Sequence, residues 1–294
     1  MKIARIRIGD TAHLARIDGE LAHPLDSADR RFDTLVDPRT ALGTQAPRSA
    51  FNEPVLVESV EMLAPVERPG SVIAIGLNYA DHALESGLEP PSAPVTFAKL
   101  PQSVIGPGEV IRWDQEQSTE VDYEAELAVV IGTEARDVPV GSALQHVLGY
   151  TCCNDVSARD AQFADGQWLR AKSFDTFCPL GPWIVTPDEI ADVQNLRIAC
   201  RVNGEYLQDS TTSQMIFGVD EIISYLSRFI TLLPGDVITT GTPVGVGFAR
   251  TPPIYLSHGD TVEIVIEGIG VLRNTCGPVM SPAGDHAAAQ SESD

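Results

Sequence analysis

The segment from Val121 to Gly132, which reads VDYEAELAVVIG, constrains the fold more than any other part of the sequence. Its second half is apolar and rich in β-branched residues, which is typical of a buried strand. Side chains alternate along a strand, so Asp122, Glu124 and Glu126 are expected to share one face. Carboxylates buried together repel one another and lose hydration, which is costly unless a cation lies between them. The segment therefore predicts either a buried metal site or an exposed edge strand with solvated acids.

A second acidic segment, YTCCNDVSARDAQ, follows another apolar run and supplies Asp155. Together with Glu124 and Glu126, Asp155 would complete a set of three carboxylate ligands. Oxygen ligands favour hard ions, so such a site would hold Mg²⁺ or Mn²⁺ in preference to zinc or copper.

The same segment carries Arg159 and Gln162, four and seven residues after Asp155. In a helix this spacing places them on the same side as Asp155. The Arg159 guanidinium either pairs with Asp155 or Asp160, or binds a substrate carboxylate through two hydrogen bonds. The sequence leaves both interpretations open.

Two further segments carry candidate catalytic side chains. In GLNYADHALESG, His82 and Glu85 are three residues apart and would be neighbours on a helix. A carboxylate beside a histidine raises its basicity and orients it, which suits a general base, although such a pair is also common by chance. Lys172 lies in a stretch of apolar and small residues, where it either brings charge to a buried site or extends to solvent.

The organisation of the chain indicates an α+β protein that is mainly β. Residues 1–66 contain short strands, with MKIARI and AHLARIDG as a pair and a turn near Gly19, and they are expected to form a small N-terminal β domain. Pro69-Gly70 marks a soft boundary before the larger domain, residues 67–280. Residues 281–294 have no periodicity and are predicted to be a disordered tail.

Within the larger domain most apolar segments are short and bounded by Gly or Pro, so strands prevail. A helix is expected after Gly218, in VDEIISYLSRFITLL, and a shorter one from about Tyr79 to Ser86. There is no regular alternation of strands and helices, so a rolled, mainly antiparallel or mixed β-sheet is predicted.

Composition excludes several classes of function. The net charge of −21 and the pI near 4.5 disfavour binding to nucleic acid or to an anionic membrane. The glycine-rich LLPGDVITTGTPVGVGF matches no nucleotide-binding motif. Five cysteines without zinc spacing suit a reducing compartment, and the N-terminus resembles neither a signal peptide nor a membrane anchor. A cytoplasmic protein is therefore expected.

Taken in order, eight segments make the chain resemble the fumarylacetoacetate hydrolase family over about residues 71 to 275. They are GLNYADHALE, VTFAKLPQSVIGPG, VDYEAELAVVIG, NDVSARDAQ, LRAKSFDTFCPLGP, VNGEYLQDSTTSQMIF, LPGDVITTGTPVGVG and VEIVIEGIGVLRN. The resemblance implies a rolled β fold, usually assembled as a homodimer.

The resemblance also implies roles for individual residues. Glu124, Glu126 and Asp155 match the family's three ligands for Mg²⁺ or Mn²⁺. His82 and Glu85 match its water-activating pair, and Lys172 matches a lysine beside the reacting carbonyl. The positions that contact substrate or organise the site are matched by Lys99, Arg159, Gln162 and Thr242.

The implied function is metal-dependent hydrolysis of a C–C bond in acylpyruvates, which are small 2,4-dioxo acids, to pyruvate and a carboxylic acid. The alternatives are isomerisation or decarboxylation of 2-hydroxyhepta-2,4-diene-1,7-dioate, and decarboxylation of oxaloacetate, which share an enolate of the 2-oxo acid. A non-catalytic metal-binding protein is a third hypothesis.

Overall fold

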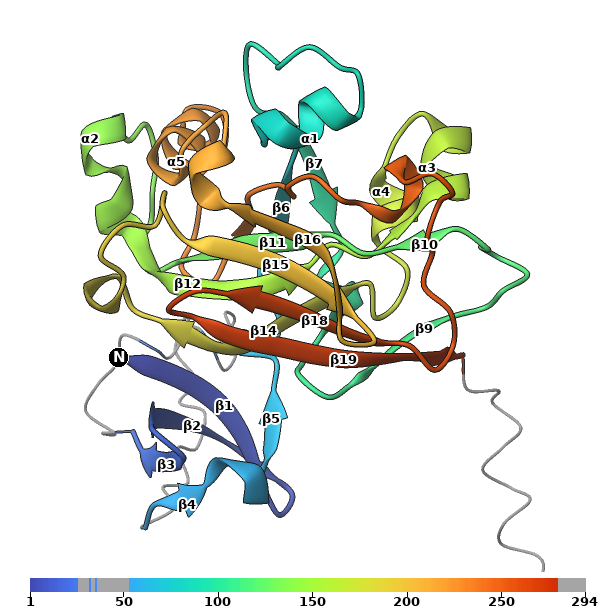
Figure 1. Ribbon diagram of the computed structural model, residues 1–294. Helices are drawn as coiled ribbons and strands as arrows, with labels where there is room; N and C mark the ends of the chain where they lie inside the picture. Colours follow the sequence, from blue (N-terminus) through green and yellow to red (C-terminus); the bar gives the residue numbers. More distant parts are fainter. Residues whose placement is uncertain (26–31, 33–34, 36–52, 280–294) are drawn as a thin grey trace, which may run out of the picture.

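The structure is a computed structural model that describes residues 1–25, 32, 35 and 53–279. Two large β-sheets pack against each other in this part of the chain, and the main hydrophobic core lies between them (Figure 1). Helices are short and lie at the edges of the sheets. The predicted mainly β fold with mixed sheets and few helices is confirmed.

In the described part of the chain the larger sheet has twelve strands. Of the strand pairs described in it, β17–β6 and β14–β8 are parallel and the others are antiparallel. In spatial order the strands are β4 (Val55–Leu56), β3 (Leu21–Pro24), β2 (Thr11–Asp18), β1 (Lys2–Ile8), β14 (Cys178–Val185), β12 (Val147–Asn154), β11 (Ala125–Ile131), β17 (Val237–Thr239), β6 (Val72–Gly76) and β7 (Val95–Lys99), with β5 (Glu61–Leu63) on β1 and β8 (Val104–Ile105) on β14.

Among the described residues the second sheet has five strands, and a short ribbon of two strands accompanies it. The five are β16 (Glu205–Thr211), β15 (Arg197–Val202), β18 (Thr261–Ile266), β19 (Gly270–Pro278) and β9 (Val110–Trp113). The ribbon pairs β10 (Val121–Asp122) with β13 (Ser157–Ala158).

Strand β11 lies between β12 and β17 and is buried along its whole length. Leu127 and Val129 pack in the core between the sheets, whereas Glu126, Ala128 and Val130 face the opposite side. The interpretation of this segment as an exposed edge strand is therefore wrong. Burial of each large aliphatic side chain stabilises the fold by about 1.5–3 kcal/mol, which helps offset the cost of holding an acid on the other face.

The helices are α1 (Ala80–Glu85), α2 (Val140–Ala143), α3 (Arg159–Asp165), α4 (Leu169–Lys172) and α5 (Val219–Ser227). Short 3-10 turns are η3 (Val57–Ser59), η4 (Pro101–Ser103), η5 (Leu144–His146), η6 (Pro187–Glu189), η7 (Thr212–Gln214) and η8 (Gly247–Ala249). The predicted helix near Tyr79–Ser86 is confirmed, because these two residues flank α1.

The helix predicted after Gly218 is confirmed at its start but ends earlier than its apolar pattern suggested. The Gly218 N–H donates to the Glu221 carboxylate, which caps the first turn. Helix α5 ends at Ser227, and Phe229 beyond it is 67% exposed. The chain leaves the helix there because Leu232 pairs with Ala135 through two backbone hydrogen bonds.

The N-terminal strands extend the larger sheet, because β1 pairs with β14 (bottom left in Figure 1). The predicted pairing of the first two strands is confirmed, but their turn lies at Gly9-Asp10, and Gly19 instead turns β2 into β3. Both glycines have φ near +57°, a conformation that favours glycine. The division into domains 1–66 and 67–280 stays a prediction, and the tail 281–294 falls outside the described residues.

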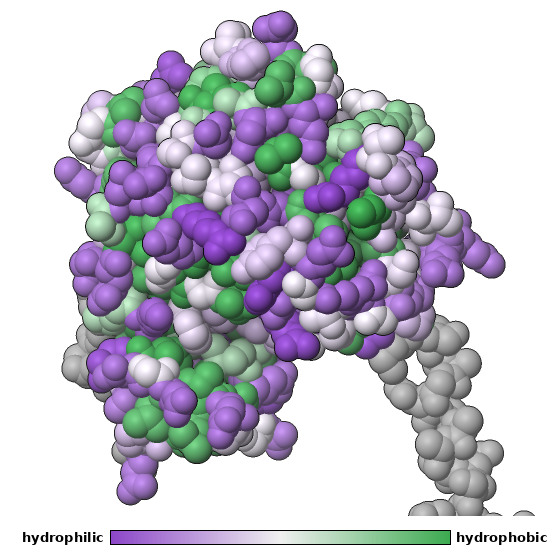
Figure 2. Space-filling view, viewed as in Figure 1, coloured by the Kyte–Doolittle hydropathy of each residue, from purple (hydrophilic) through white to green (hydrophobic). Residues whose placement is uncertain are grey.

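Hydrophilic residues are interspersed with apolar ones over the face seen in Figure 2. Among the described residues no helix is both long and apolar enough to cross a membrane.

Candidate metal centre and active site

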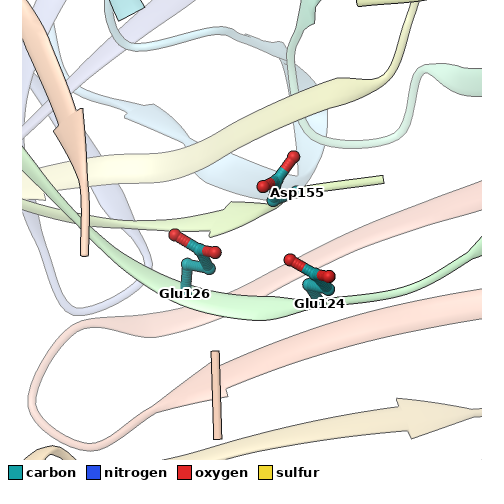
Figure 3. Close-up of side chains that lie close together, drawn as sticks. All are labelled: Glu124, Glu126 and Asp155. Carbon is teal, nitrogen blue, oxygen red and sulfur yellow. The ribbon is translucent and has the colours of Figure 1, made fainter. Parts of the chain in front are cut away.

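Three carboxylates lie close together where β11 begins. Glu124, Glu126 and Asp155 are buried, and one oxygen of each lies within 4.8 Å of the others. Figure 3 shows the three side chains gathered around a common space. The structure therefore brings together the three residues predicted as ligands.

The register of β11 and β12 explains why residues so far apart in sequence meet. Ala125 is paired with Asn154, so Asp155 follows β12 at the point where Glu124 precedes β11. The Asp155 N–H donates to the Glu124 carbonyl over 3.0 Å, and the Glu124 N–H donates to the Asn154 side chain over 3.0 Å. Backbone and side-chain hydrogen bonds thus fix both ligand positions.

Three buried cations surround the carboxylates. Lys172 donates to Glu124 and Asp155, each over 2.8 Å. Lys99 donates to Asp155, and Arg159 donates to Glu124. Lys172 therefore brings charge to a buried site and does not extend to solvent, which decides between its two interpretations.

This cluster contains more carboxyl groups than cations. With Asp122, which pairs with Arg159, four buried carboxylates face three cations. Burial alone would raise the pKa of Glu124, but Lys172 and Arg159 outweigh it and lower that pKa to about 2. Burial, with Asp155 and Glu124 nearby, raises the pKa of Glu126 well above its ordinary value.

These properties fit a hard divalent cation. The donor set consists of carboxylate oxygens, which Mg²⁺ and Mn²⁺ prefer. Only the Gly241 N–H, at 2.9 Å, donates to Glu126 among the hydrogen bonds of the described residues. Glu126 is thus the least compensated of the three acids, and a cation between them would offset the burial and the repulsion that raise its pKa.

His82 and Glu85 form the predicted pair on α1. The His82 Nδ1 lies 3.0 Å from a Glu85 oxygen, and the other Glu85 oxygen accepts from the Gly245 N–H at 2.9 Å. A ring nitrogen facing a carboxylate carries the proton, which leaves Nε2 as the basic atom. The pair is therefore oriented by the loop that follows β17.

Arg159 is held by residues other than the two predicted aspartates. Its Nε donates to Asp122 over 2.9 Å, and its other nitrogens donate to Glu124 and to Gln162. Asp122 also accepts from the N–H groups of Gly247 and Phe248. Arg159 thus has a structural role in fixing Glu124, whatever it does for a substrate.

A cavity of about 260 Å³ opens onto this cluster. Predicted site residues in its lining are His82, Glu124, Glu126, Arg159, Gln162, Lys172 and Thr242. The lining does not include Glu85, Lys99 and Asp155. Glu85 bonds His82, Asp155 bonds Lys172, and Lys99 bonds Asp155, so these residues hold the lining side chains in place. Small-molecule sites commonly measure about 300–1,000 Å³, so this cavity suits a compact substrate.

Sequence reasoning missed several residues that organise the site. Gln208 is buried, accepts from the Ala125 N–H, and donates to the Thr242 hydroxyl over 2.8 Å. Asn78 is buried beside α1 and donates to the Thr240 carbonyl. Both join distant segments, and no local pattern of charge or spacing could have identified them.

Comparison with known proteins identifies the family. Residues 71–276 match the family model described as "Fumarylacetoacetate (FAA) hydrolase C-terminal". A curated relative from Bos taurus, "Oxaloacetate tautomerase FAHD2A, mitochondrial", is 49% identical over 243 residues, which are 82% of this chain and 75% of the relative.

Two solved structures share the fold over nearly the whole chain. A fumarylacetoacetate hydrolase from Exiguobacterium antarcticum has a TM-score of 0.81 and 37% identity, covering 95% of this chain and 100% of that one. A 2-hydroxyhepta-2,4-diene-1,7-dioate isomerase from Mycobacterium marinum has a TM-score of 0.78 and 38% identity, covering 96% and 100%. The chain belongs to the fumarylacetoacetate hydrolase family.

The relative's name overturns the expectation of a cytoplasmic protein, because that relative is named as mitochondrial. The expectation depended on the unpaired cysteines and on an N-terminus that resembles neither a signal peptide nor a membrane anchor; all five cysteines are free and buried. Buried thiols are chemically inert, so they do not identify a compartment.

Proposed function

We propose that this member of the fumarylacetoacetate hydrolase family is a divalent-metal-dependent tautomerase, which interconverts the keto and enol forms of small 2-oxo acids. The observation that carries the proposal is that His82 and Lys172 line the same cavity as Glu124 and Glu126. The relative named oxaloacetate tautomerase supports oxaloacetate as the substrate to test first.

His82 is the proton-transferring residue in this proposal. Its Nδ1 faces Glu85, so Nε2 can remove a proton from C3 of a 2-oxo acid and return it in the reverse reaction. Glu85 holds the ring and stabilises the imidazolium that forms. A positioned acid–base group of this kind contributes a factor of about 10²–10⁴ in rate.

Lys172 is the second reacting side chain. Two of the three protons on its ammonium are directed to Glu124 and Asp155, which leaves one for the cavity. That proton can stabilise negative charge on the 2-oxo oxygen and complete the enol. A divalent cation on Glu124, Glu126 and Asp155 would act as a Lewis acid on the 2-oxo acid.

Hydrolysis of acylpyruvates is the second candidate function. The 3.0 Å contact between His82 and Glu85 favours it, because an oriented histidine can also activate water. Decarboxylation of oxaloacetate and isomerisation of 2-hydroxydienedioates would use the same enol chemistry, and one structural neighbour is named as such an isomerase.

The experiment that tests the proposal follows two products from one substrate panel. Oxaloacetate and acetylpyruvate are each incubated in D₂O with the protein and either Mg²⁺ or EDTA. The controls are Mg²⁺ without protein and the His82→Ala variant. NMR reports exchange of the C3 protons, and an enzymatic assay reports pyruvate.

Rapid exchange in oxaloacetate that needs both metal and His82, without release of pyruvate, is the expected result. Pyruvate from acetylpyruvate would favour the hydrolase, and pyruvate from oxaloacetate would favour the decarboxylase. If neither substrate reacts faster than with Mg²⁺ alone, the tautomerase proposal is wrong.

The homodimer implied by the family resemblance is also a proposal. Light scattering on the protein as it elutes from a size-exclusion column measures its molar mass directly. A mass near twice 31.6 kDa supports the dimer, and a mass near 31.6 kDa contradicts it.

A further inference from the structure

Aromatic side chains form much of the cavity wall. Phe97 from β7 and Trp168 beside α4 make one edge-to-face pair, with ring centroids 5.1 Å apart. Phe163 from α3 and Phe248 from η8 make a second edge-to-face pair, with centroids 5.7 Å apart. Ring edges and faces exposed to a cavity offer stacking partners for a planar ligand.

Each aromatic pair begins next to a buried cation of the site. The Lys172 ammonium lies 5.2 Å from the centre of the Phe97 ring, and the Arg159 guanidinium lies 4.5 Å from the centre of the Phe248 ring. A substrate whose 2-oxo acid end reaches the carboxylate cluster would therefore place its C3 substituent near aromatic rings.

A second carboxylate on the substrate would find no unpaired cation in the described lining. Lys172 is paired with Glu124 and Asp155, and Arg159 is paired with Asp122 and Glu124. The ring of His82 faces Glu85. Because no cation of the described lining is reserved for a second carboxylate, replacing the C4 carboxylate of oxaloacetate by an uncharged group sacrifices no ion pair with these residues.

We infer that the site also tautomerises arylpyruvates, which are monoanionic 2-oxo acids with an aromatic ring on C3. The inference rests on the proposed tautomerase and names a second substrate class for it. In enolisation the C3–H bond breaks, a C2–C3 double bond forms, the C2–O double bond becomes single and the 2-oxo oxygen gains a proton, so no further reagent is consumed. The enol is conjugated with the ring, and its planar shape matches the aromatic walls.

Phenylpyruvate is the probe for this inference. Exchange of its C3 protons is measured by NMR in D₂O with Mg²⁺, beside oxaloacetate under the same conditions. Saturation-transfer NMR on the phenyl protons reports binding without turnover. We expect metal-dependent exchange of phenylpyruvate and saturation transfer to its ring.

Phe163 provides the discriminating variant, because it lines the cavity and is 63% exposed, so its replacement does not disturb the core. Phe163→Ala should lower the ratio of kcat/KM for phenylpyruvate to that for oxaloacetate about fivefold, the factor expected for one aromatic contact. Phe229→Ala is the matched control, since Phe229 is 67% exposed but lies beyond α5. It should leave the ratio unchanged.

The outcomes distinguish failure of the inference from failure of the proposed function. Exchange in oxaloacetate but not in phenylpyruvate would overturn the inference and leave the tautomerase intact. An equal ratio in Phe163→Ala and the parent protein would also overturn the aromatic subsite. If neither substrate exchanges its C3 protons, both the proposed tautomerase activity and the inference are wrong.

Discussion

Replacement of Lys172 by methionine tests the electrostatics of the site without relying on turnover. Methionine has a similar length and keeps the packing, but it removes the ammonium that bonds Glu124 and Asp155 at 2.8 Å each. Because all three groups are buried, the two carboxylates lose a charged partner where an uncompensated charge is costly.

The size of the effect follows from that burial. Removing one partner from a buried ion pair typically costs about 3–5 kcal/mol. Proton uptake by the clustered acids relieves part of the repulsion, so we expect a loss of about 3 kcal/mol in the free energy of unfolding without metal. For a chain of this size 1 kcal/mol shifts the melting temperature by about 2–4 °C, which gives a decrease of roughly 10 °C.

A divalent cation should compensate for the missing ammonium. Metal binding stabilises a folded protein by about 2.7 kcal/mol at a hundredfold excess over Kd. In Lys172→Met the cation no longer shares the Glu124 and Asp155 oxygens with Lys172, so Mg²⁺ should raise its melting temperature more than that of the parent protein.

Differential scanning calorimetry with EDTA and with Mg²⁺ measures both effects. Arg170→Met is the matched control, because Arg170 is on the same helix but pairs with Asp165 at the surface. Its melting temperature should not change measurably. If Lys172→Met without metal were as stable as the parent protein, the carboxylates would not depend on the ammonium and the described charge balance would be wrong.

Three further predictions address the ligands, the base and the thiols. Glu126→Gln should abolish the rise in melting temperature with Mg²⁺ while the metal-free protein stays as stable as the parent. Burial raises the pKa of Glu126, so the neutral amide replaces a carboxyl that is costly to ionise without a cation; calorimetry that still shows a full metal response would exclude Glu126 as a ligand. His82→Ala should lower kcat about a hundredfold and leave the Mg²⁺ Kd unchanged, as measured by exchange kinetics and calorimetric titration; an unchanged kcat would place the base elsewhere. The five cysteines are buried and free, and burial raises the pKa of the Cys200 thiol, so a disulfide reagent should react with none in the native protein and with all five in denaturant; fast native labelling would contradict this.

The ligand residues could be predicted because their chemistry is local. Glu124 and Glu126 precede an apolar run, and this combination is costly in a protein without a cation. Their meeting with Asp155 depends on the β11–β12 register, which is a long-range property. The sequence indicated the individual ligand residues, and the pairing of β11 with β12 brings them together.

Other features depended on contacts that leave no local pattern. Asp122 was expected beside Glu124 and Glu126 on one strand, but it belongs to β10, which pairs with β13, and it holds Arg159. The end of α5 was misplaced because its apolar spacing continues through Phe229. The chain instead turns away after Ser227, and Leu232 pairs with Ala135. In both cases a partner distant in sequence decided the local structure.

The two-sided burial of β11 limits how this protein can change during evolution. Alternate residues of the strand serve different purposes, with Leu127 in the core and Glu126 in the site. Insertion or deletion of one residue would exchange the two faces, placing a leucine among the ligands and a carboxylate in the core. The lineage can therefore alter this segment by substitution but not in length. Variation in length has to be absorbed elsewhere in the chain, so family members that differ in size are expected to keep an ungapped alignment through the strand.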